Sequence, residues 1–221
     1  MKRLASLALG MVLLLALTAC GTTNRLNPSQ AESNSSDTKA VSETAEVNTS
    51  TNVPSSDSQK NGKVLIAYFS CTGNTKKTAG YIAKAITADQ YEIIPEKLYS
   101  TDDLNYNNPK SRSSLEQKDD SARPVITGKI DHMDEYDVVF IGYPIWWGQA
   151  PRIISTFLES YDFSAKTVIP FCTSGSSGIE GSVPKLQSCC SNKTTWLTGK
   201  RFSGNAEVSE VEKWVNSIKL R

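Results

Sequence analysis

Phe69-Ser70-Cys71-Thr72-Gly73-Asn74-Thr75 is the stretch that decides the fold of this chain, because of what lies on either side of it. The preceding run, residues 63–68, is apolar after Lys63 and rich in strand-forming residues. The following residues, 75–88, carry apolar side chains at helical spacing. The pattern predicts a strand that ends in a short polar loop and continues as a helix.

This loop has the composition of a phosphate site. Its backbone N–H groups and the positive end of the helix dipole are expected to point into one space. Ser70, Thr72 and Thr75 add hydroxyls, Asn74 adds an amide, and Gly73 adds flexibility. The loop is not a Walker motif, since G-x-x-x-x-G-K-[ST] is absent. It therefore suits a single phosphate held by neutral donors, and the alternative is a plain strand–helix turn.

The remainder of the domain alternates between strand-like and helix-like patterns. Strand character is found at residues 91–94, 137–142, 167–172 and 195–197, and helical character at 150–161, 179–190 and 206–220. Pro170 lies inside one predicted strand, which indicates a bulge or a missing ladder bond. The alternation predicts an α/β fold: a single domain over residues 63–221 with a doubly wound, five-stranded parallel sheet. Ligands bind such sheets at the carboxyl ends of the strands.

Two further loops follow predicted strands and so share this edge with the first. Tyr143-Pro144-Ile145-Trp146-Trp147-Gly148-Gln149 contains adjacent tryptophans, which expose a large apolar surface unless something flat lies on them. The alternative is that the pair packs on a neighbouring loop. Thr173-Ser174-Gly175-Ser176-Ser177-Gly178 is nearly all Gly and Ser, so its backbone can approach a ligand closely. A phosphate loop, an aromatic plate and a Gly-rich loop together predict a mononucleotide site.

In these three loops and their order, residues 63–221 resemble the flavodoxin-like family. The resemblance implies the sheet order 2-1-3-4-5, with flavin mononucleotide (FMN) bound where the order reverses. Carried over by position, it implies that the phosphate is bound by the first loop and that the ring lies between the other two. The implied cofactor-binding residues are Ser70, Cys71, Thr72, Gly73, Asn74, Thr75, Pro144, Ile145, Trp146, Trp147, Gly148, Thr173, Ser174, Gly175, Ser176 and Gly178.

Three features depart from the family's pattern. Cys71 occupies a loop position where the family usually has a less reactive residue. The third loop lacks the aromatic residue that stacks on the ring in many flavodoxins, so we expect one face of the flavin to be more open. Residues 98–126 form a long polar insertion that carries Arg112 and Arg123, either as a lid or as a loop packed beside the site.

The function that the resemblance implies is electron transfer by bound FMN, to a redox partner protein or a small-molecule acceptor. The alternative is an FMN-dependent reductase of the quinone or nitro-compound type, with the open flavin face as its substrate site. A third class, a binding module that keeps the fold without flavin, is disfavoured because all three loops are intact.

The N-terminus has the layout of a bacterial export signal. Lys2 and Arg3 precede an apolar core at residues 4–16, which is too short to span a bilayer. Leu17-Thr18-Ala19-Cys20 resembles a lipobox, so residues 1–19 are expected to be removed and Cys20 lipidated on the extracytoplasmic face of the cell membrane. The alternative is an ordinary secretory signal. Residues 20–62 are rich in Ser, Thr and Asn, which predicts a disordered tether.

The charge balance and the cysteine and histidine content bear on nucleic-acid binding, disulfide formation and metal binding. The 24 Lys and Arg residues nearly balance 23 Asp and Glu, and no basic run predicts nucleic-acid binding. The predicted sheet places Cys71 and Cys172 two strands apart, which favours free thiols. Cys189 and Cys190 are expected to be reduced, with a strained vicinal disulfide as the alternative. With a single histidine, His132, and no CxxC motif, no metal site is expected.

Overall fold

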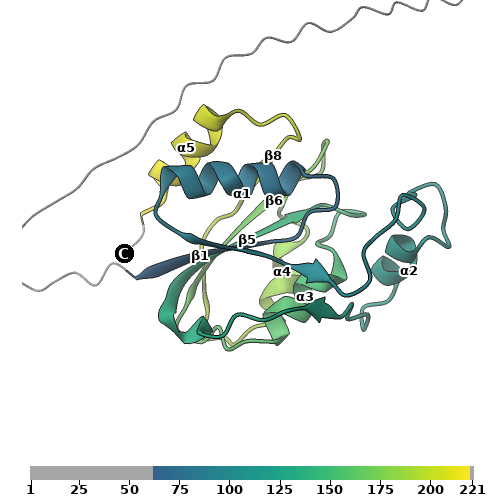
Figure 1. Cartoon of the computed structure of the whole chain (residues 1–221), viewed down its shortest axis with the longest axis horizontal. Helices are drawn as coiled ribbons and strands as arrows, with labels where there is room; N and C mark the ends of the chain where they lie inside the picture. The colour runs from purple at the N-terminus through teal and green to yellow at the C-terminus, as the bar shows by residue number, and fades with distance from the viewer. Residues whose placement is uncertain (1–61, 220–221) are drawn as a thin grey trace, which may run out of the picture. The chain divides into compact units, whose positions relative to one another are not determined.

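The computed structural model describes residues 62–219, and a parallel sheet runs through them (Figure 1). Its strands are β1 (Lys63–Tyr68), β2 (Asp89–Glu92), β5 (Tyr136–Pro144), β6 (Thr167–Thr173), β7 (Thr195–Trp196) and β8 (Lys200–Phe202). The strand order is β2-β1-β5-β6-β7, and β8 also pairs with β6. Since β7 and β8 pair with successive parts of β6, they form one interrupted fifth strand. The predicted order 2-1-3-4-5 is confirmed.

Helices cover both faces of this sheet (Figure 1). On one face, α1 (Asn74–Ala85) and α5 (Val208–Ser217) contribute to one core layer. On the other face, α3 (Arg152–Glu159) and α4 (Val183–Gln187) contribute to the second layer. The insertion (residues 98–126) contains α2 (Arg112–Lys118). It leads into β4 (Ile126–Thr127), which pairs antiparallel with β3 (Ile94–Pro95), and a single 3₁₀ turn, η1 (Met133–Glu135), precedes β5.

Strand β5 contributes side chains to both core layers, one on each face of the sheet. Val139 and Ile141 pack into the layer that contains α3, whereas Val138 and Phe140 pack into the layer that contains α1. This alternation follows from the two-residue period of a strand. All four side chains are buried, as the apolar run at residues 137–142 predicts for a central parallel strand.

Pro170 explains the interruption of the edge strand. The register between β5 and β6 continues unbroken through Pro170, but the outer neighbour of β6 divides into β7 and β8 at this level. Gly199 lies in the gap, where a Cβ atom would be 2.6 Å from the Pro170 carbonyl oxygen. The ladder is therefore missing on the outer side of Pro170, which is one of the two predicted outcomes.

Several element boundaries differ from the sequence prediction. Helix α1 ends at Ala85 rather than residue 88, because the β-branched Ile86 is already extended. Helix α4 covers only residues 183–187 of the predicted 179–190, since Pro184 is tolerated at the start of a helix and not in its interior. The predicted strand at 91–94 is divided between β2 and β3, and β8 was not predicted.

The four cysteines of the described residues are free thiols, so Cys189 and Cys190 form no vicinal disulfide here. No helix within residues 62–219 has the length and apolar character needed to cross a bilayer. In the same part of the chain, no group of three His, Cys, Asp or Glu side chains is placed to hold a metal ion. The predicted signal at residues 1–19, the lipid site at Cys20 and nearly all of the predicted tether lie outside the described residues.

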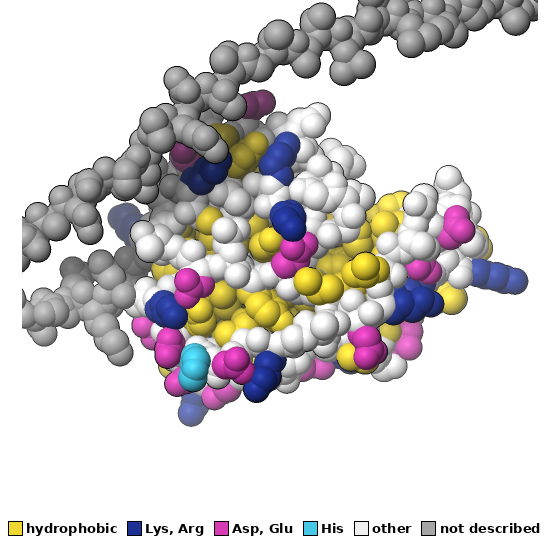
Figure 2. Space-filling model, viewed as in Figure 1, with side chains coloured by type: hydrophobic (Ala, Val, Ile, Leu, Met, Phe, Trp, Pro, Cys, Tyr) yellow, Lys and Arg dark blue, Asp and Glu magenta, His cyan; other side chains and the backbone are white. Residues whose placement is uncertain are grey.

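Charged side chains of both signs are interspersed over the face of the molecule shown in Figure 2. Hydrophobic side chains gather in a band across the middle of this face, below α1. The large hydrophobic residues exposed on the described domain are Ile94, Leu98, Tyr106, Leu115, Val125 and Trp147. Two of them, Tyr106 and Trp147, lie at the candidate site described next.

Candidate functional site

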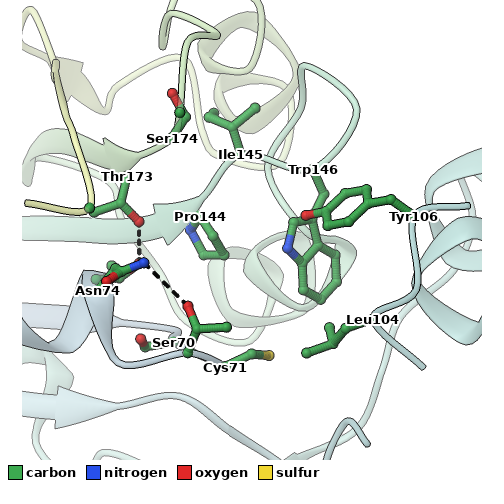
Figure 3. Close-up of a pocket in the computed structure, with 14 residues that line it drawn as sticks. Ser70, Cys71, Asn74, Leu104, Tyr106, Pro144, Ile145, Trp146, Thr173 and Ser174 are labelled. Atoms are coloured by element: carbon green, nitrogen blue, oxygen red, sulfur yellow. Dashed lines mark hydrogen bonds between the residues drawn. The ribbon is translucent and has the colours of Figure 1, made fainter. Parts of the chain in front are cut away.

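A cavity of about 440 Å³ lies at the carboxyl ends of β1, β5 and β6, where the sheet order reverses (Figure 3). Its size is within the range of small-molecule sites, about 300–1,000 Å³. The three predicted loops meet there. The cavity is lined by Ser70, Cys71, Thr72, Asn74, Thr75, Leu104, Tyr106, Pro144, Ile145, Trp146, Thr173, Ser174, Gly175 and Gly204.

The cavity is polar at one end and aromatic at the other (Figure 3). The polar end consists of Ser70, Thr72, Asn74, Thr75 and Thr173. The aromatic end consists of Leu104, Tyr106 and Trp146, with Pro144, Ile145 and Cys71 between the two ends. A ligand that matches this distribution carries an anionic or strongly polar group at one end and a flat, mostly apolar group at the other.

The start of α1 supplies backbone donors to the polar end. Gly73 is the N-cap residue of α1 and has a left-handed backbone, with φ of 84°. It has no side chain to cap the helix, and the first turn contains no acidic residue. The unpaired N–H groups of a first turn, together with the helix dipole, attract anions. This geometry fits the predicted phosphate loop, although Gly73 itself does not line the cavity.

Two buried threonines join the first and third loops. The hydroxyls of Thr75 and Thr173 are 2.8 Å apart and hydrogen-bonded to each other. Thr75 is 1% exposed and Thr173 is 5% exposed. Two hydroxyls carry two protons, and this bond uses one of them. The second proton is therefore available for an acceptor in the cavity, while the bond fixes the distance between the two loops.

The nearest lysines of α1 are engaged with other groups. The Lys76 ammonium contacts a Glu92 carboxylate oxygen at 2.7 Å, and the Lys77 ammonium donates to the carbonyl oxygen of Gly204 at 2.9 Å. Gly204 was not predicted as a site residue, because it follows the unpredicted strand β8. The polar end thus depends on neutral donors, as the sequence of the loop predicts.

Cys71 lies between the two ends as a neutral thiol. Burial raises the pKa of the Cys71 thiol to about 12, and the Glu116 carboxylate acts in the same direction while the Arg112 guanidinium opposes them. At neutral pH the sulfur therefore carries no charge. A thiolate here would repel an anionic ligand, and the neutral thiol does not.

Trp146 forms the inner wall of the aromatic end. It is 3% exposed and packs edge-to-face against Phe69 and Tyr99, with ring centroids 5.6 Å and 5.2 Å away. The Gln117 amide nitrogen donates to the Trp146 carbonyl oxygen at 3.0 Å and to that of Ala150 at 3.2 Å. The indole is therefore held from several sides before any ligand binds.

Trp147 and Gly148 form the tip of a tight turn and do not line the cavity. The backbone N–H groups of Trp146 and Gln149 each donate to the other's carbonyl oxygen at 2.9 Å. Both central residues have positive φ, 47° for Trp147 and 76° for Gly148, which is the pattern of a type I′ turn. Trp147 is 45% exposed, and its ring lies 4.6 Å from that of Tyr106. The tryptophan pair is thus divided between the cavity wall and the surface.

The third loop is held from behind by an arginine that sequence reasoning missed. Thr173, Ser174 and Gly175 line the cavity, whereas Ser176 and Gly178 do not. The Arg201 guanidinium on β8 donates to the carbonyl oxygens of Ser174 and Gly175 and to the Ser174 hydroxyl. These bonds tie two loop carbonyls to a fixed positive charge.

The insertion contributes Leu104 and Tyr106 to the cavity, and neither was predicted as a site residue. Arg152 on α3 is 3% exposed and anchors this segment. Its guanidinium donates to the carbonyl oxygens of Glu116 and Gln117 at 3.2 Å and 2.8 Å, and to an Asp120 carboxylate at 2.6 Å. Of the two predicted roles, these contacts favour a loop packed beside the site. The only sequence signal for Leu104 and Tyr106 is their apolar character within a polar segment.

The comparisons with known proteins agree with this geometry. Residues 63–218 match the model of a family described as Flavodoxin. A putative flavoprotein from Bacteroides uniformis is similar to this chain, with 44% identity, a TM-score of 0.67, and coverage of 71% of this chain and 99% of that one. A putative flavoprotein from Bacteroides eggerthii has 42% identity and the same TM-score, with coverage of 72% and 99%.

A more distant structure is a flavoprotein from Lactobacillus acidophilus solved in complex with FMN. It has 26% identity and a TM-score of 0.53, with coverage of 69% of this chain and 98% of that one. The comparison with curated proteins found no match. Nearly the full length of each of these solved structures is thus covered by about 70% of this chain.

Proposed function

This chain belongs to the flavodoxin family, and we propose that its domain binds FMN and transfers electrons with it. The observation that carries the proposal is the cavity with one polar and one aromatic end at the β1–β5 reversal of the sheet. The polar end suits a phosphate, and the aromatic end suits an isoalloxazine ring. The flavoprotein from Lactobacillus acidophilus that was solved with FMN supports the choice of ligand. Bound flavin supplies one- and two-electron redox chemistry.

Different residues of this chain would bind the phosphate and the ring. The N–H groups at the start of α1 and the hydroxyls of Thr72 and Thr75 would hold the phosphate. Trp146, Pro144 and Ile145 would contact the ring on one side, and the loop at residues 173–175 would contact it on the other. Because the Cys71 thiol is uncharged, it would not repel the phosphate. Trp147, Gly148, Ser176 and Gly178 lie outside the cavity wall, and a role for them in binding stays a prediction.

An electron carrier is favoured over a quinone or nitro-compound reductase by the walls of the aromatic end. A reductase of that type needs an open flavin face where its substrate can stack. In this domain, Leu104 and Tyr106 of the insertion line the aromatic end and would cover part of that face. The redox partner, a protein or a small-molecule acceptor, would then exchange electrons at an exposed edge of the ring. The neutral charge balance and the site chemistry give no role to nucleic acid.

We propose in addition that the domain is tethered to the extracytoplasmic face of the cell membrane through acyl chains on Cys20. The support is the sequence of residues 2–20, with its basic start, apolar core and lipobox-like end. Two or more acyl chains anchor a protein stably where one chain does not. If residues 20–62 form the predicted tether, a flexible chain of about forty residues would reach roughly 35 Å, enough to hold the domain clear of the headgroups.

The flavin proposal is tested by expressing residues 62–221 and recording the visible spectrum after gel filtration. The expected result is a yellow protein that releases FMN, and not the dinucleotide, on denaturation. A colourless domain that also fails to take up added FMN would refute the proposal.

The tether proposal needs the full chain and a separate measurement. Replacing Cys20 by Ala should move the protein from the membrane fraction to the soluble fraction, or leave it uncleaved. A normally cleaved Cys20→Ala protein that stays with the membrane would place the anchor elsewhere.

A further inference from the structure

The third loop contains no aromatic residue, yet the aromatic end of the cavity has a second aromatic side chain beside Trp146. That side chain is Tyr106, which comes from the insertion rather than from any of the three predicted loops. Figure 3 shows the Tyr106 ring beside Trp146, with Leu104 below them. Although the residue is 54% exposed, burial against the rest of the site raises the pKa of the Tyr106 phenol, and the neighbouring Cys71 adds to this effect.

The segment that carries Tyr106 is fastened to α2 by buried serines. The backbone N–H and the hydroxyl of Ser113 both donate to the Asp103 carbonyl oxygen, at 3.0 Å and 2.6 Å. The Ser114 hydroxyl donates to the Asn108 carbonyl oxygen at 2.8 Å. Ser113 and Ser114 are 1% and 4% exposed. Residues 103 to 108 are thus fixed at both ends, with Leu104 and Tyr106 between them.

The Trp147 ring, which lies outside the cavity wall, packs against the Tyr106 ring. Their rings are 4.6 Å apart and inclined by 39°, although both residues are substantially exposed. Trp147 also has a positive φ of 47°, which is rare for a bulky residue and strains the backbone. Backbone strain of this kind occurs preferentially at functional sites. Here the strained turn carries the indole that packs against Tyr106.

We propose that Tyr106 stacks on the outer face of the flavin ring and that Trp147 is the residue that positions it. The inference rests on the proposed FMN function and adds a specific ring-binding residue to it. Tyr106 supplies the aromatic contact that the loop at residues 173–178 lacks. The expectation of an open flavin face is replaced by a face covered from the insertion, so that bulky planar substrates are excluded while electrons still pass at the ring edge.

The test compares four proteins as apo-domains titrated with FMN and with riboflavin, which lacks the phosphate. The variants are Tyr106→Ala, Tyr106→Phe and, as a matched control, Leu115→Ala, an exposed insertion residue that does not line the cavity. An aromatic contact of this type corresponds to roughly a three- to tenfold change in affinity. Tyr106→Ala should weaken both ligands by this same factor and move the visible bands of bound flavin toward those of free flavin. Tyr106→Phe and Leu115→Ala should leave affinity and spectrum unchanged.

Trp147 is tested in the same assay by a double-mutant comparison. Trp147→Ala should weaken flavin binding in the wild-type background and have no effect in the Tyr106→Ala background, because it acts through Tyr106. If wild type binds FMN and Tyr106→Ala binds it equally well with an unchanged spectrum, the inference is wrong and the FMN proposal stands. If wild type binds neither ligand, both are wrong.

Discussion

The two ends of the cavity are built in different ways. The polar end comes mainly from Ser70, Thr72, Asn74 and Thr75, in one short segment between a strand and the start of a helix, and its geometry follows from local backbone rules. The aromatic end is assembled from Trp146 after β5 and from Leu104 and Tyr106 in the insertion, which buried contacts such as those of Arg152 hold in place. A ligand with a phosphate and a ring therefore meets one local and one long-range binding surface, and the two can be altered separately.

The largest expected effect concerns the thiol between the two ends. With a pKa of about 12, Cys71 is almost fully protonated at pH 8, and its thiolate fraction is on the order of a thousandfold below that of an unperturbed cysteine. Alkylation by iodoacetamide should be slower by about this factor than in a peptide of the same loop. The rate should rise about tenfold per pH unit up to pH 11, because the group loses its proton only as pH approaches the raised pKa. A plateau near pH 9 would show that a thiolate forms beside the phosphate position.

The second prediction concerns the aromatic end alone and a substitution that destabilises the insertion that forms part of it. Arg152→Met removes a buried guanidinium that donates to two backbone carbonyls and a carboxylate. We expect the insertion to lose about 2–4 kcal/mol of stability, because the two backbone carbonyls lose their buried charged donor. The ion pair with Asp120 adds little to this loss, because Asp120 is exposed and its attraction is screened. Hydrogen exchange should show faster amide exchange in α2 and unchanged protection in α1. Equal acceleration in both helices would mean that the insertion is not a separately anchored unit.

A smaller effect is expected at the local end. Thr75→Val keeps the shape of the side chain but removes the hydroxyl that bonds Thr173 and faces the cavity. Loss of a donor to a charged group costs about 1–3 kcal/mol, or roughly five- to 150-fold in FMN affinity. Thr78→Val is the matched control, because the Thr78 hydroxyl donates to the Asn74 carbonyl oxygen and does not line the cavity. A similar loss of FMN affinity in both variants would point to a helix defect rather than to a lost phosphate contact.

The difference between the two ends also explains what could be predicted from the sequence. The loop at residues 70–75 was predictable because its strand, loop and helix are contiguous and carry distinct periodicities. Leu104, Tyr106 and Arg201 were not, because their positions depend on contacts between distant segments. The different burial of the two tryptophans was not predictable from their sequence either, because it depends on the type I′ turn, in which Trp146 is buried and Trp147 exposed.

In the fold too, features set by local sequence were predictable, and features set by contacts between distant segments were not. The parallel sheet was predictable from the alternation of elements, and its strand order from the resemblance to the family. The short α4 and the interrupted edge strand were not, since each depends on one proline acting within a tertiary environment, Pro184 and Pro170.

The measurement that tests the two-ended site most directly is a double-mutant cycle on ligand binding. Wild type, Thr75→Val, Tyr106→Ala and the double variant would be titrated with FMN and with riboflavin by calorimetry. The account predicts that Thr75→Val weakens FMN binding and leaves riboflavin binding unchanged, that Tyr106→Ala weakens both ligands equally, and that the two losses for FMN add within about 0.5 kcal/mol. Strong coupling between the two substitutions, or a loss of riboflavin affinity in Thr75→Val, would contradict the separation of the two ends.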